Sequence, residues 1–579
     1  MALLSILSLL PLLVWFVYKL LRYYRLEQFR GLPRMKPDLI WGHMKVVGEY
    51  VKEVEKERKG AHEDYAFKKI SDDLGSPSLF VLDMRPLFYP LCIVNSHQVM
   101  EQIARPSQIF KYSVPKSPTL KWLEPLIGST SIIMADGEDW RPIRKRFNPG
   151  FAPTHLVTLL PAILSKTERF TKRLDALAKS SEEFQLGELC TSLTFDIIGA
   201  VVLDEDFKAQ TPDQHPIVQE YRALAAAFEG AAPFNVPFGP TRSKRQKLGR
   251  KVDQSIKTVV IQKFAQQLQA RKEGQDSRKG RSVIDLSLQD TDILTPAILQ
   301  ETADQVKSFL FAGHDTTSIL LQWSFYTLST HPHILSKLTH ELNTIFGAST
   351  HPSSVSTQLL LRGEECLNKL TYTSAFIKEI LRLYPPASTA RMPPKGSGYK
   401  ITDPQTGNEM CLDGFVIYGN HYNIGRDKSI YGTTADEFFP ERWLDNIDPS
   451  TDSNTTPTTA PLSNPQKTRA PNSIPPTSWR PFERGPRNCI GQELANIEAR
   501  IILACSARHY RFSKIGIGAL KVGGTGKLVI DKNGIVETEG IMYNRRQVTA
   551  KPFDDMRMRV AIKGRVNKDN PIPIPESKI

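Results

Sequence analysis

The sequence predicts a mainly α-helical protein with small β-sheets, an α+β fold, preceded by one N-terminal transmembrane helix. An uncharged apolar stretch opens the chain. Short apolar runs bounded by turn residues, at 78–82 and 90–94, predict strands of a small sheet. Hydrophobic residues recur at helical spacing in several long segments, of which the clearest are 184–203, 251–271, 294–329 and 367–383.

The amino end supplies the strongest local signal. Residues 2–18 carry no charge, and Leu20 and Leu21 extend the apolar stretch beyond Lys19, whose long side chain can snorkel. The stretch approaches the roughly 20 residues needed to cross a bilayer. A cleaved signal peptide is the alternative, but no basic region precedes the apolar run and no small-residue cleavage site follows it.

Basic residues follow the apolar stretch directly at Lys19, Arg22, Arg25 and Arg30. The positive-inside rule then leaves the rest of the chain in the cytosol. In a eukaryotic cell this predicts a single-pass protein of the endoplasmic reticulum membrane. We see no second comparable span in the sequence, which favours a tethered enzyme over a transporter.

Composition limits the partners that the protein can have. The 579 residues carry a formal net charge of +14, with a pI of about 9.3, which suits an acidic partner. The basic residues are scattered without interleaved aromatic residues, so we expect no nucleic acid. The six cysteines are irregularly spaced without a C-x-x-C pair, which predicts a reducing compartment and no disulfide framework.

Segment composition divides the chain into four parts. We predict an N-terminal membrane anchor at 1–30, a proline-containing hinge at 31–40, a catalytic domain at 41–565 and a C-terminal tail at 566–579. Within the catalytic domain, residues 449–477 are dominated by Ser, Thr, Pro and Asn, and this low-complexity composition predicts a surface loop insertion.

One loop holds a cysteine in an unusual setting. Residues 481–491 read PFERGPRNCIG, and a helical pattern begins at Gln492 directly afterwards. Gly485 can take a positive φ, and Gly491 lets the backbone approach a flat cofactor closely. Backbone N–H groups of the turn and of the next helix would stabilise a thiolate at Cys489. A buried structural cysteine is the alternative interpretation.

A second motif lies within the helical pattern of residues 305–328, where Ala312 to Thr317 read AGHDTT. A glycine among good helix formers and a threonine that can bond back to the preceding turn predict a local distortion of the helix. An acid beside a hydroxyl, Asp315 beside Thr316, can deliver protons to a nearly dry site. A polar patch on a partly exposed helix is the alternative. We expect His314 to be a satisfied neighbour rather than a catalyst.

The order F-x-x-G-x-R-x-C-x-G after A-G-H-D-T-T, E-x-x-R and P-E-R resembles the cytochrome P-450 superfamily over roughly residues 35–565. The resemblance implies the cytochrome P-450 fold and one haem b, iron protoporphyrin IX, with Cys489 as the axial metal ligand. A thiolate ligand pushes electron density onto iron and favours O–O cleavage. The resemblance also implies a catalytic proton relay in Asp315 and Thr316.

Further roles come from the same resemblance. It implies haem contacts by Phe482, Ala312 and Gly491, propionate contacts by Arg487, Trp140, Arg144 and Arg391, and a buried structural network of Glu379, Arg382 and Arg442. For the arginines a solvated basic face is the alternative, and that face, with Lys145 and Arg146, could also dock an acidic reductase. The sequence departs from the family pattern in one place, because residues 449–477 lengthen the spacing between Arg442 and Phe482.

The function implied is a monooxygenase that activates dioxygen and oxidises a lipophilic small molecule by hydroxylation, epoxidation or desaturation. No flavin or dinucleotide fingerprint occurs in the sequence, so electrons from NADPH would come through NADPH-cytochrome P-450 reductase, with cytochrome b5 as an additional candidate partner. The overall style resembles fungal members that tailor polyketides or terpenoids. A reductase-independent haem-thiolate isomerase or dehydratase and a non-catalytic haem- or sterol-binding membrane protein are the alternatives, and the Asp315-Thr316 relay argues against both.

Overall fold

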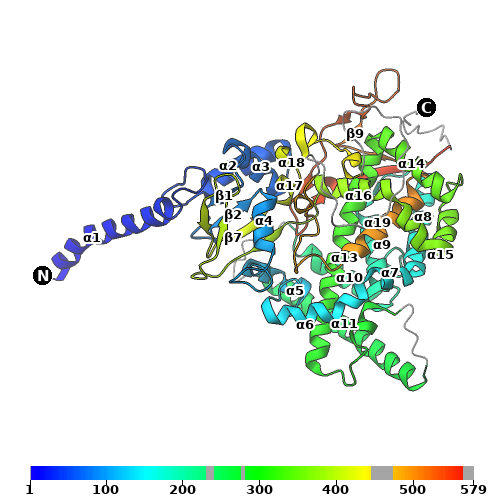
Figure 1. Cartoon of the computed structure of the whole chain (residues 1–579), viewed down its shortest axis with the longest axis horizontal. Coiled ribbons are helices and arrows are strands. Elements are labelled where there is room, and N and C mark those ends of the chain that lie inside the picture. Colours follow the sequence, from blue (N-terminus) through cyan, green and yellow to red (C-terminus); the bar gives the residue numbers. More distant parts are fainter. Residues whose placement is uncertain (1, 230–239, 275–280, 445–473, 565–579) are drawn as a thin grey trace.

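The computed structural model describes residues 2–229, 240–274, 281–444 and 474–564 (Figure 1). It is mainly helical with small β-sheets, which confirms the predicted fold class. The predicted tail at 566–579 and residues 449–473 of the predicted insertion lie outside the described residues.

Helices form most of the body. Their bounds are α1 Ala2–Arg22, α2 Met44–Glu57, α3 Glu63–Asp73, α4 His97–Ala104, α5 Glu124–Ile127, α6 Gly137–Phe147, α7 Pro153–Thr158, α8 Leu160–Ser180, α9 Leu186–Leu203, α10 Pro216–Ala226, α11 Pro240–Lys272, α12 Val283–Ser287, α13 Pro296–Thr330, α14 Pro332–Phe346, α15 Pro352–Lys369, α16 Thr371–Leu383, α17 His421–Ile424, α18 Lys428–Tyr431 and α19 Gln492–Ser506.

The strands are short and belong to several small sheets. Their bounds are β1 Leu79–Leu82, β2 Leu91–Val94, β3 Phe184–Gln185, β4 Thr389–Arg391, β5 Lys400–Thr402, β6 Glu409–Cys411, β7 Val416–Gly419, β8 Tyr510–Lys514, β9 Ala519–Leu520, β10 Thr538–Glu539, β11 Asn544–Arg545, β12 Lys551–Pro552 and β13 Arg557–Ile562.

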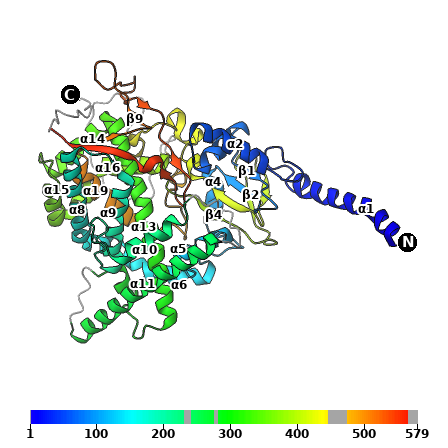
Figure 2. The same cartoon turned by 180° about the vertical axis from the view of Figure 1, so that it is seen from behind.

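The largest described sheet has the order β1-β2-β7-β4, with β2 and β7 parallel and the other pairs antiparallel. It lies on the α1 side of the molecule beside α2 and α4, away from α8, α15 and α19 (Figure 2). Helix α13 runs through the core and contacts α5, α9, α11, α16 and α19.

The structure confirms most elements that the hydrophobic pattern predicts, with one clear difference at α11. This helix begins at Pro240, whereas the pattern predicts a start at residue 251. Residues 240–250 are rich in Arg, Lys and Gln, which are good helix formers but leave no apolar stripe. Hydrophobic periodicity therefore misses the first turns.

The predicted distortion of α13 is wrong, because the helix is unbroken from Pro296 to Thr330. Thr316 Oγ1 does bond back to the carbonyl of Ala312, at 2.8 Å. Gly313 serves packing instead, since a Cβ there would lie 2.7 Å from Cδ1 of Ile198 on α9. The glycine lets α9 and α13 approach each other closely.

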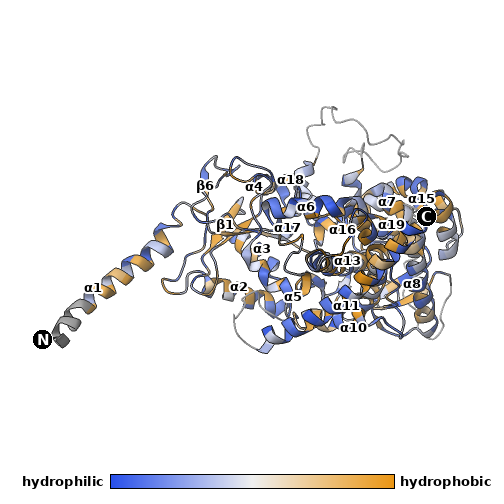
Figure 3. Cartoon of the chain, turned by 90° about the horizontal axis from the view of Figure 1, so that it is seen from below, coloured by the Kyte–Doolittle hydropathy of each residue, from blue (hydrophilic) through white to orange (hydrophobic). Residues whose placement is uncertain are grey.

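Helix α1 projects from the body as a separate rod (Figure 3). Its side chains from Leu10 to Leu20 are exposed, and all of them are uncharged except that of Lys19. Among the described residues, α9 is the helix that is both long and apolar enough to cross a membrane, but it is mostly buried and belongs to the core. Length and composition alone would therefore select a core helix.

The segment after α1 is packed into the body. Arg25, which lies in the π-helix Tyr23–Glu27, is buried, and its Nη1 lies 2.6 Å from Oδ2 of Asp83. Phe29 is fully buried and contacts the ring of Phe415 edge-on. The division into anchor, hinge, catalytic domain and tail stays a prediction. Arg25 and Phe29, at the end of the predicted anchor, pack against the sheet region.

The two ends of the low-complexity segment are held at one place on α16. Trp443 Nε1 donates to Oε2 of Glu379 at 2.8 Å, and Trp479 Nε1 donates to the carbonyl of Lys378 at 2.9 Å. The ammonium of Lys378 lies 4.2 Å and 5.5 Å from the two indole rings. Because the chain leaves and returns at neighbouring residues, the added length between Arg442 and Phe482 does not displace the cysteine loop.

Candidate functional site

The cysteine loop is a tight turn that ends in α19. Cys489 N donates to the carbonyl of Phe482 at 2.8 Å, and Asn488 N donates to that of Gly485 at 3.2 Å. Gly485 has φ +76°, and a Cβ there would overlap the carbonyl oxygen of Ala104. Only glycine suits this position, for two reasons. The first is the positive φ that the sequence indicates, and the second is the close approach of α4.

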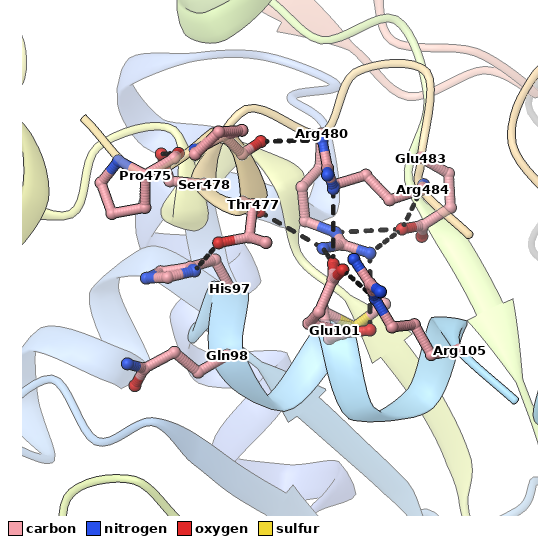
Figure 4. A network of polar contacts seen from close by, with 12 residues as sticks. His97, Gln98, Glu101, Arg105, Pro475, Thr477, Ser478, Arg480, Glu483 and Arg484 are labelled. Atoms are coloured by element: carbon pink, nitrogen blue, oxygen red, sulfur yellow. Dashed lines mark hydrogen bonds and ion pairs between the residues drawn. The ribbon is translucent and has the colours of Figure 1, made fainter. Parts of the chain in front are cut away.

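A polar network fixes the segment that leads into this loop (Figure 4). Arg480 is fully buried and lies 2.7 Å from Glu101 on α4, and it also contacts Glu483. His97 Nδ1 lies 2.8 Å from Oγ1 of Thr477. A buried guanidinium with two carboxylate partners holds the start of the loop rigidly against α4.

Cys489 lies deep in the protein but is accessible. Its side chain is exposed, yet desolvation by the surrounding protein raises the pKa of its thiol. Backbone N–H groups of Gly491 and Gln492 and the charge of Arg144 oppose this shift of the pKa but do not overcome it. The thiol is thus accessible, and the expected stabilisation of the thiolate by the turn is present but is outweighed by burial.

Positive charge is concentrated beside the loop. Arg487 Nη1 lies 2.7 Å from Asp136, and its guanidinium lies 4.9 Å from the ring centre of Trp140. Burial, with repulsion by Arg391, lowers the pKa of Arg487 to about 10, so it stays charged. Burial, with Arg391 and Arg487, also lowers the pKa of Lys116 well below its usual value. We call Lys116, Arg391 and Arg487 the basic cluster.

Arg391 is incompletely satisfied. It is fully buried, and its Nη1 donates to Ser113 Oγ at 3.1 Å and to the carbonyl of Val114 at 3.2 Å. Its Nε and Nη2 have no hydrogen-bond partner among the described residues. An unpaired buried guanidinium is costly, so this position calls for an additional acceptor.

The structure places the other predicted haem contacts around the same loop. Arg144 donates from Nη1 to the carbonyl of Asn488 at 2.7 Å and from Nη2 to its side chain at 3.0 Å. Phe482 is partly buried, with its ring centre 5.8 Å from that of Trp479. Gly491 has an ordinary φ of −87°, and a Cβ there would meet only Cys489 Sγ, at 3.9 Å. The backbone conformation of Gly491 does not require glycine. The absence of a side chain instead leaves open space beside Cys489.

Two faces of α13 carry the predicted relay. Ala312 and Thr316 are partly accessible within a helix that is otherwise mostly buried. Asp315 is buried, and its Oδ1 lies 2.7 Å from Nζ of Lys551 on β12 while its Oδ2 accepts from Thr549. Burial raises the pKa of the Asp315 carboxyl, but Lys551 and its other partners hold it below the usual value. Asp315 and Thr316 are adjacent in sequence, but the Asp315 carboxylate is bound to Lys551 and Thr549.

The neighbouring His314 is a satisfied core residue. Its Nδ1 lies 2.5 Å from the carbonyl of Leu310, and its ring contacts those of Phe195 and Tyr221 edge-on. Burial lowers the pKa of its imidazole, which keeps it neutral. These contacts leave it no role in proton delivery to the site.

The structure brings Glu379, Arg382 and Arg442 together. Arg382 Nη2 lies 2.6 Å from Glu379 Oε1, and Arg442 Nε lies 3.0 Å from the same oxygen. Arg382 also donates to the carbonyl oxygens of Gly425, Ala435 and Glu437. Both Glu379 and Arg382 are almost fully buried, and the network ties α16 to the segment before the low-complexity insertion.

Sequence reasoning missed two residues of the site, Lys116 and Lys551. Each is brought to the site by strand pairing or packing with a distant segment: Lys116 forms an isolated β-bridge with Arg391, and Lys551 pairs with Asp315. Neither lysine stands in a motif of its own. An unpaired acid in the middle of a buried helix was the available signal for a cation such as Lys551, because buried charges need partners.

The comparisons with known proteins now identify the family. A family model described as cytochrome P-450 matches residues 78–521. The chain is 32% identical to cytochrome P-450 monooxygenase acrF of Aspergillus aculeatus over 75% of this chain and 84% of that protein. It is 28% identical to cytochrome P-450 monooxygenase polC of Polytolypa hystricis over 85% and 84%, and 28% identical to human cytochrome P-450 4V2 over 69% and 71%.

The chain belongs to the cytochrome P-450 family, and its relatives include fungal monooxygenases, as the sequence predicts. It is an oxygenase, and its cofactor is haem b, which this family holds through a thiolate. The donor set fits that cofactor. The thiol of Cys489 is accessible, and beside it the basic cluster is short of negative charge, which the two propionates of a haem carry.

Proposed function

We propose that this protein is a membrane-anchored monooxygenase that oxidises a lipophilic secondary metabolite, polyketide or terpenoid in character, with electrons from NADPH. The observation that carries the proposal is the placement of the accessible Cys489 beside the basic cluster, on a loop held by Gly485. A thiolate-bound haem supplies the cleavage of dioxygen in such an enzyme. The substrate class rests on the fungal relatives and on the apolar character of the expected contact regions.

In this proposal Cys489 is the axial ligand of the iron, and Phe482 and Arg144 hold its loop in place. Arg487, Arg391 and Trp140 bind the propionates, and Lys116 joins them from the strand bridge to Arg391. The partly accessible Ala312 and Gly491 leave room for the cofactor and for dioxygen. A contact or an accessible face of the residue supports each of these roles.

The proton relay comprises Thr316 and Asp315. The Thr316 hydroxyl is oriented by its bond to the carbonyl of Ala312, and this bond leaves its lone pairs free to accept a proton from the space beside the helix. Asp315 is held as a carboxylate by Lys551, so it can pass on a proton only when that ion pair opens. Glu379, Arg382 and Arg442 have a structural role, because their network is buried and saturated.

Helix α1 is the anchor in this proposal and holds the enzyme at the endoplasmic reticulum, with the catalytic domain in the cytosol. Its exposed apolar side chains and the basic residues of its last turn, Lys19 and Arg22, support this location. NADPH-cytochrome P-450 reductase would be the electron donor, with cytochrome b5 as an additional partner. The exposed Lys145 beside Arg144 provides positive charge for an acidic partner.

A reduced, carbon-monoxide-treated spectrum tests the ligand. The wild type should show the Soret band specific to thiolate-bound haem, and Cys489→Ser should lose it. Cys411→Ser is the matched control, because Cys411 is also exposed but lies on the distant strand β6. If Cys489→Ser kept the thiolate band, the central proposal would fail.

The electron source separates the remaining alternatives. NADPH-dependent turnover should require added reductase, with metabolites from a knockout strain as the candidate substrates. A haem-thiolate isomerase or dehydratase would act on a peroxide without reductase, and a binding protein would show no turnover under either condition. Removal of residues 2–22 should release the protein from membranes with its spectrum intact, and continued membrane attachment would count against α1 as the only anchor.

A further inference from the structure

A second pocket lies away from the cysteine loop. It has a volume of about 540 Å³ and is walled by α11, by α5 with the turn before it, and by the first half of α13. Figures 1 and 2 both place α5 and α11 together on one side of the molecule, and both helices contact α13. None of the residues predicted to bind haem or to relay protons lines this pocket.

Two glycines set the walls of the pocket. A Cβ on Gly249 of α11 would lie 2.7 Å from the carbonyl oxygen of Pro125 on α5. Gly128 has φ +89°, and a Cβ there would overlap the side chain of Asp304 on α13. The backbone of α11 thus lies close against that of α5, and the residue after α5 lies close against the Asp304 side chain of α13, which makes the pocket a pre-formed cavity.

Two buried cations line the pocket, and among the described residues neither forms an ion pair. Lys307 of α13 is 4% exposed, and within the described ranges its ammonium makes no hydrogen bond or ion pair. Arg245 of α11 is 7% exposed. Its Nε donates to the carbonyl of Ala227, and its guanidinium lies 4.4 Å from the ring centre of Phe228, but in the part of the chain described here no carboxylate pairs with it.

The acidic residues of the pocket are either already engaged or at its rim. Asp304 accepts hydrogen bonds from Ser129, from the backbone and hydroxyl of Thr130, and from Gln300. Asp253 lies 2.8 Å from Lys257 and also accepts from Gln300. Glu124 is exposed at the rim, where Lys121 and Arg250 add positive charge. The hydrogen bonds of Asp304 come from neutral groups, so its negative charge remains and offsets only part of the positive charge of Lys307 and Arg245.

We propose that this pocket binds a phosphate-bearing molecule, with Lys307 and Arg245 as its buried charge partners and Lys121 and Arg250 at its entrance. A guanidinium and an ammonium in the wall of one cavity offer donors and positive charge for the multiple oxygens and double charge of a phosphate group. Burial, which its acidic neighbours do not fully offset, lowers the pKa of Lys307, and a bound anion would reverse that effect. The ligand is either a soluble phosphorylated compound or the headgroup of an anionic phospholipid.

Inorganic phosphate and pyrophosphate test the site in the full-length, haem-containing protein. Binding is measured by calorimetric titration and by the rise in Tm, against chloride at equal ionic strength, because a ligand that binds the folded state stabilises it. Lys307→Met should weaken binding by about tenfold or more, since a hydrogen-bonded charge is lost. Lys307→Met should fold at least as well as wild type without phosphate, because it removes an unpaired buried charge, and its carbon monoxide spectrum verifies this.

Lys251→Met is the matched control. Lys251 lies on α11 next to Arg250 but does not line the pocket, and the substitution changes the net charge equally. Its phosphate binding should equal that of the wild type. Phosphate binding that is unaffected by Lys307→Met, or that Lys251→Met weakens equally, would overturn the proposal.

A separate experiment tests whether the ligand is a phospholipid headgroup. The full-length protein is placed in lipid nanodiscs of phosphatidylcholine, with or without phosphatidic acid, and its Tm is compared with that of Lys307→Met. A rise in Tm with phosphatidic acid that Lys307→Met abolishes identifies a headgroup, and a response to soluble phosphate alone identifies a soluble ligand. If neither probe distinguishes Lys307→Met from wild type, the pocket is not a phosphate site. The proposed monooxygenase function does not depend on this result.

Discussion

Nζ of Lys551 lies 2.7 Å from Oδ1 of Asp315, so the acid of the proposed relay is held in an ion pair by a strand near the carboxyl end of the chain. Thr549, two residues before Lys551, donates to the other oxygen of the same carboxylate. Such a carboxylate is ionised and pre-oriented, and it accepts a proton only at the cost of the pair. In the proposed relay, proton delivery would therefore be coupled to the position of the segment that carries β12.

Replacement of Lys551 by Met should raise the pKa of Asp315 above the ordinary range for a carboxyl, because burial would no longer be opposed by the ammonium. Infrared difference spectra should then show a protonated carboxyl near neutral pH that is absent from the wild type and from the double variant Lys551→Met/Asp315→Asn. Lys527→Met, an exposed change elsewhere, should leave the spectrum unchanged. An unchanged spectrum for Lys551→Met would show that the pair does not control Asp315.

Thr316→Ala should divert electrons from product to hydrogen peroxide. The variant lacks the hydroxyl that Ala312 orients, so protons reach the site without control. The measurement is peroxide released per NADPH consumed in the presence of reductase, which needs no knowledge of the natural substrate. Thr316→Ser retains the hydroxyl and should stay close to wild type. Equal peroxide yields from Thr316→Ala and wild type would remove Thr316 from the relay.

The helices and the cysteine loop were predictable from sequence because their signals are local. Apolar residues at helical spacing define α9, α13 and α16, and a glycine before Cys489 marks the turn that Gly485 forms. The turns of α11 before residue 251 carry no apolar stripe, so the same method fails there. Hydrophobic periodicity predicts a helix only where the residues of the segment itself mark its buried face.

Contacts between distant segments were not predictable in this way. No local pattern links Lys551 to Asp315 or Lys116 to Arg391, since each pair forms only when the fold is complete. Gly313 shows the same limit in another form. Its residue type indicates a special backbone position, but the reason, the side chain of Ile198 on another helix, lies outside the motif.

Glu379→Gln should destabilise the protein by about 3–5 kcal/mol, because Arg382 and Arg442 would be left as buried charges without their carboxylate. The urea midpoint and the yield of haem-containing protein measure the effect. Glu365→Gln breaks an exposed ion pair with Lys369 that solvent screens, so its urea midpoint should stay close to that of the wild type. Similar midpoints for the two variants would contradict the structural role of the network.

Gly485→Ala should abolish the thiolate-haem spectrum or lower its yield severely. The change adds strain at a positive φ and also places a Cβ against the carbonyl of Ala104. Gly534→Ala separates the two effects, because Gly534 has the same φ of +76° but its nearest neighbour would be His333 Nδ1 at 3.7 Å. The control should lose only about 1–2 kcal/mol and keep its spectrum. Equal losses would mean that φ alone, and not the contact with α4, explains Gly485.

His331, at the junction of α13 and α14, should make the protein acid-sensitive. Burial, with repulsion from His333, lowers the pKa of His331 to about 4. Its unfolded value is about 6.5, so between these pH values the unfolded chain binds a proton that the folded protein does not. Stability from this residue is therefore complete above pH ~6.5 and is lost as the pH falls toward 4, by up to about 3 kcal/mol.

The test compares the Tm of wild type and His331→Gln across this range. The side chain of Gln can replace the polar contacts of His331 with Thr327 and Thr330 but cannot be protonated. The difference in Tm between the two proteins should be constant above pH ~6.5 and should shift in favour of the variant on acidification. Other groups titrate in both proteins alike, so a difference that stays constant down to pH ~4 would show that His331 takes up its proton equally in both states.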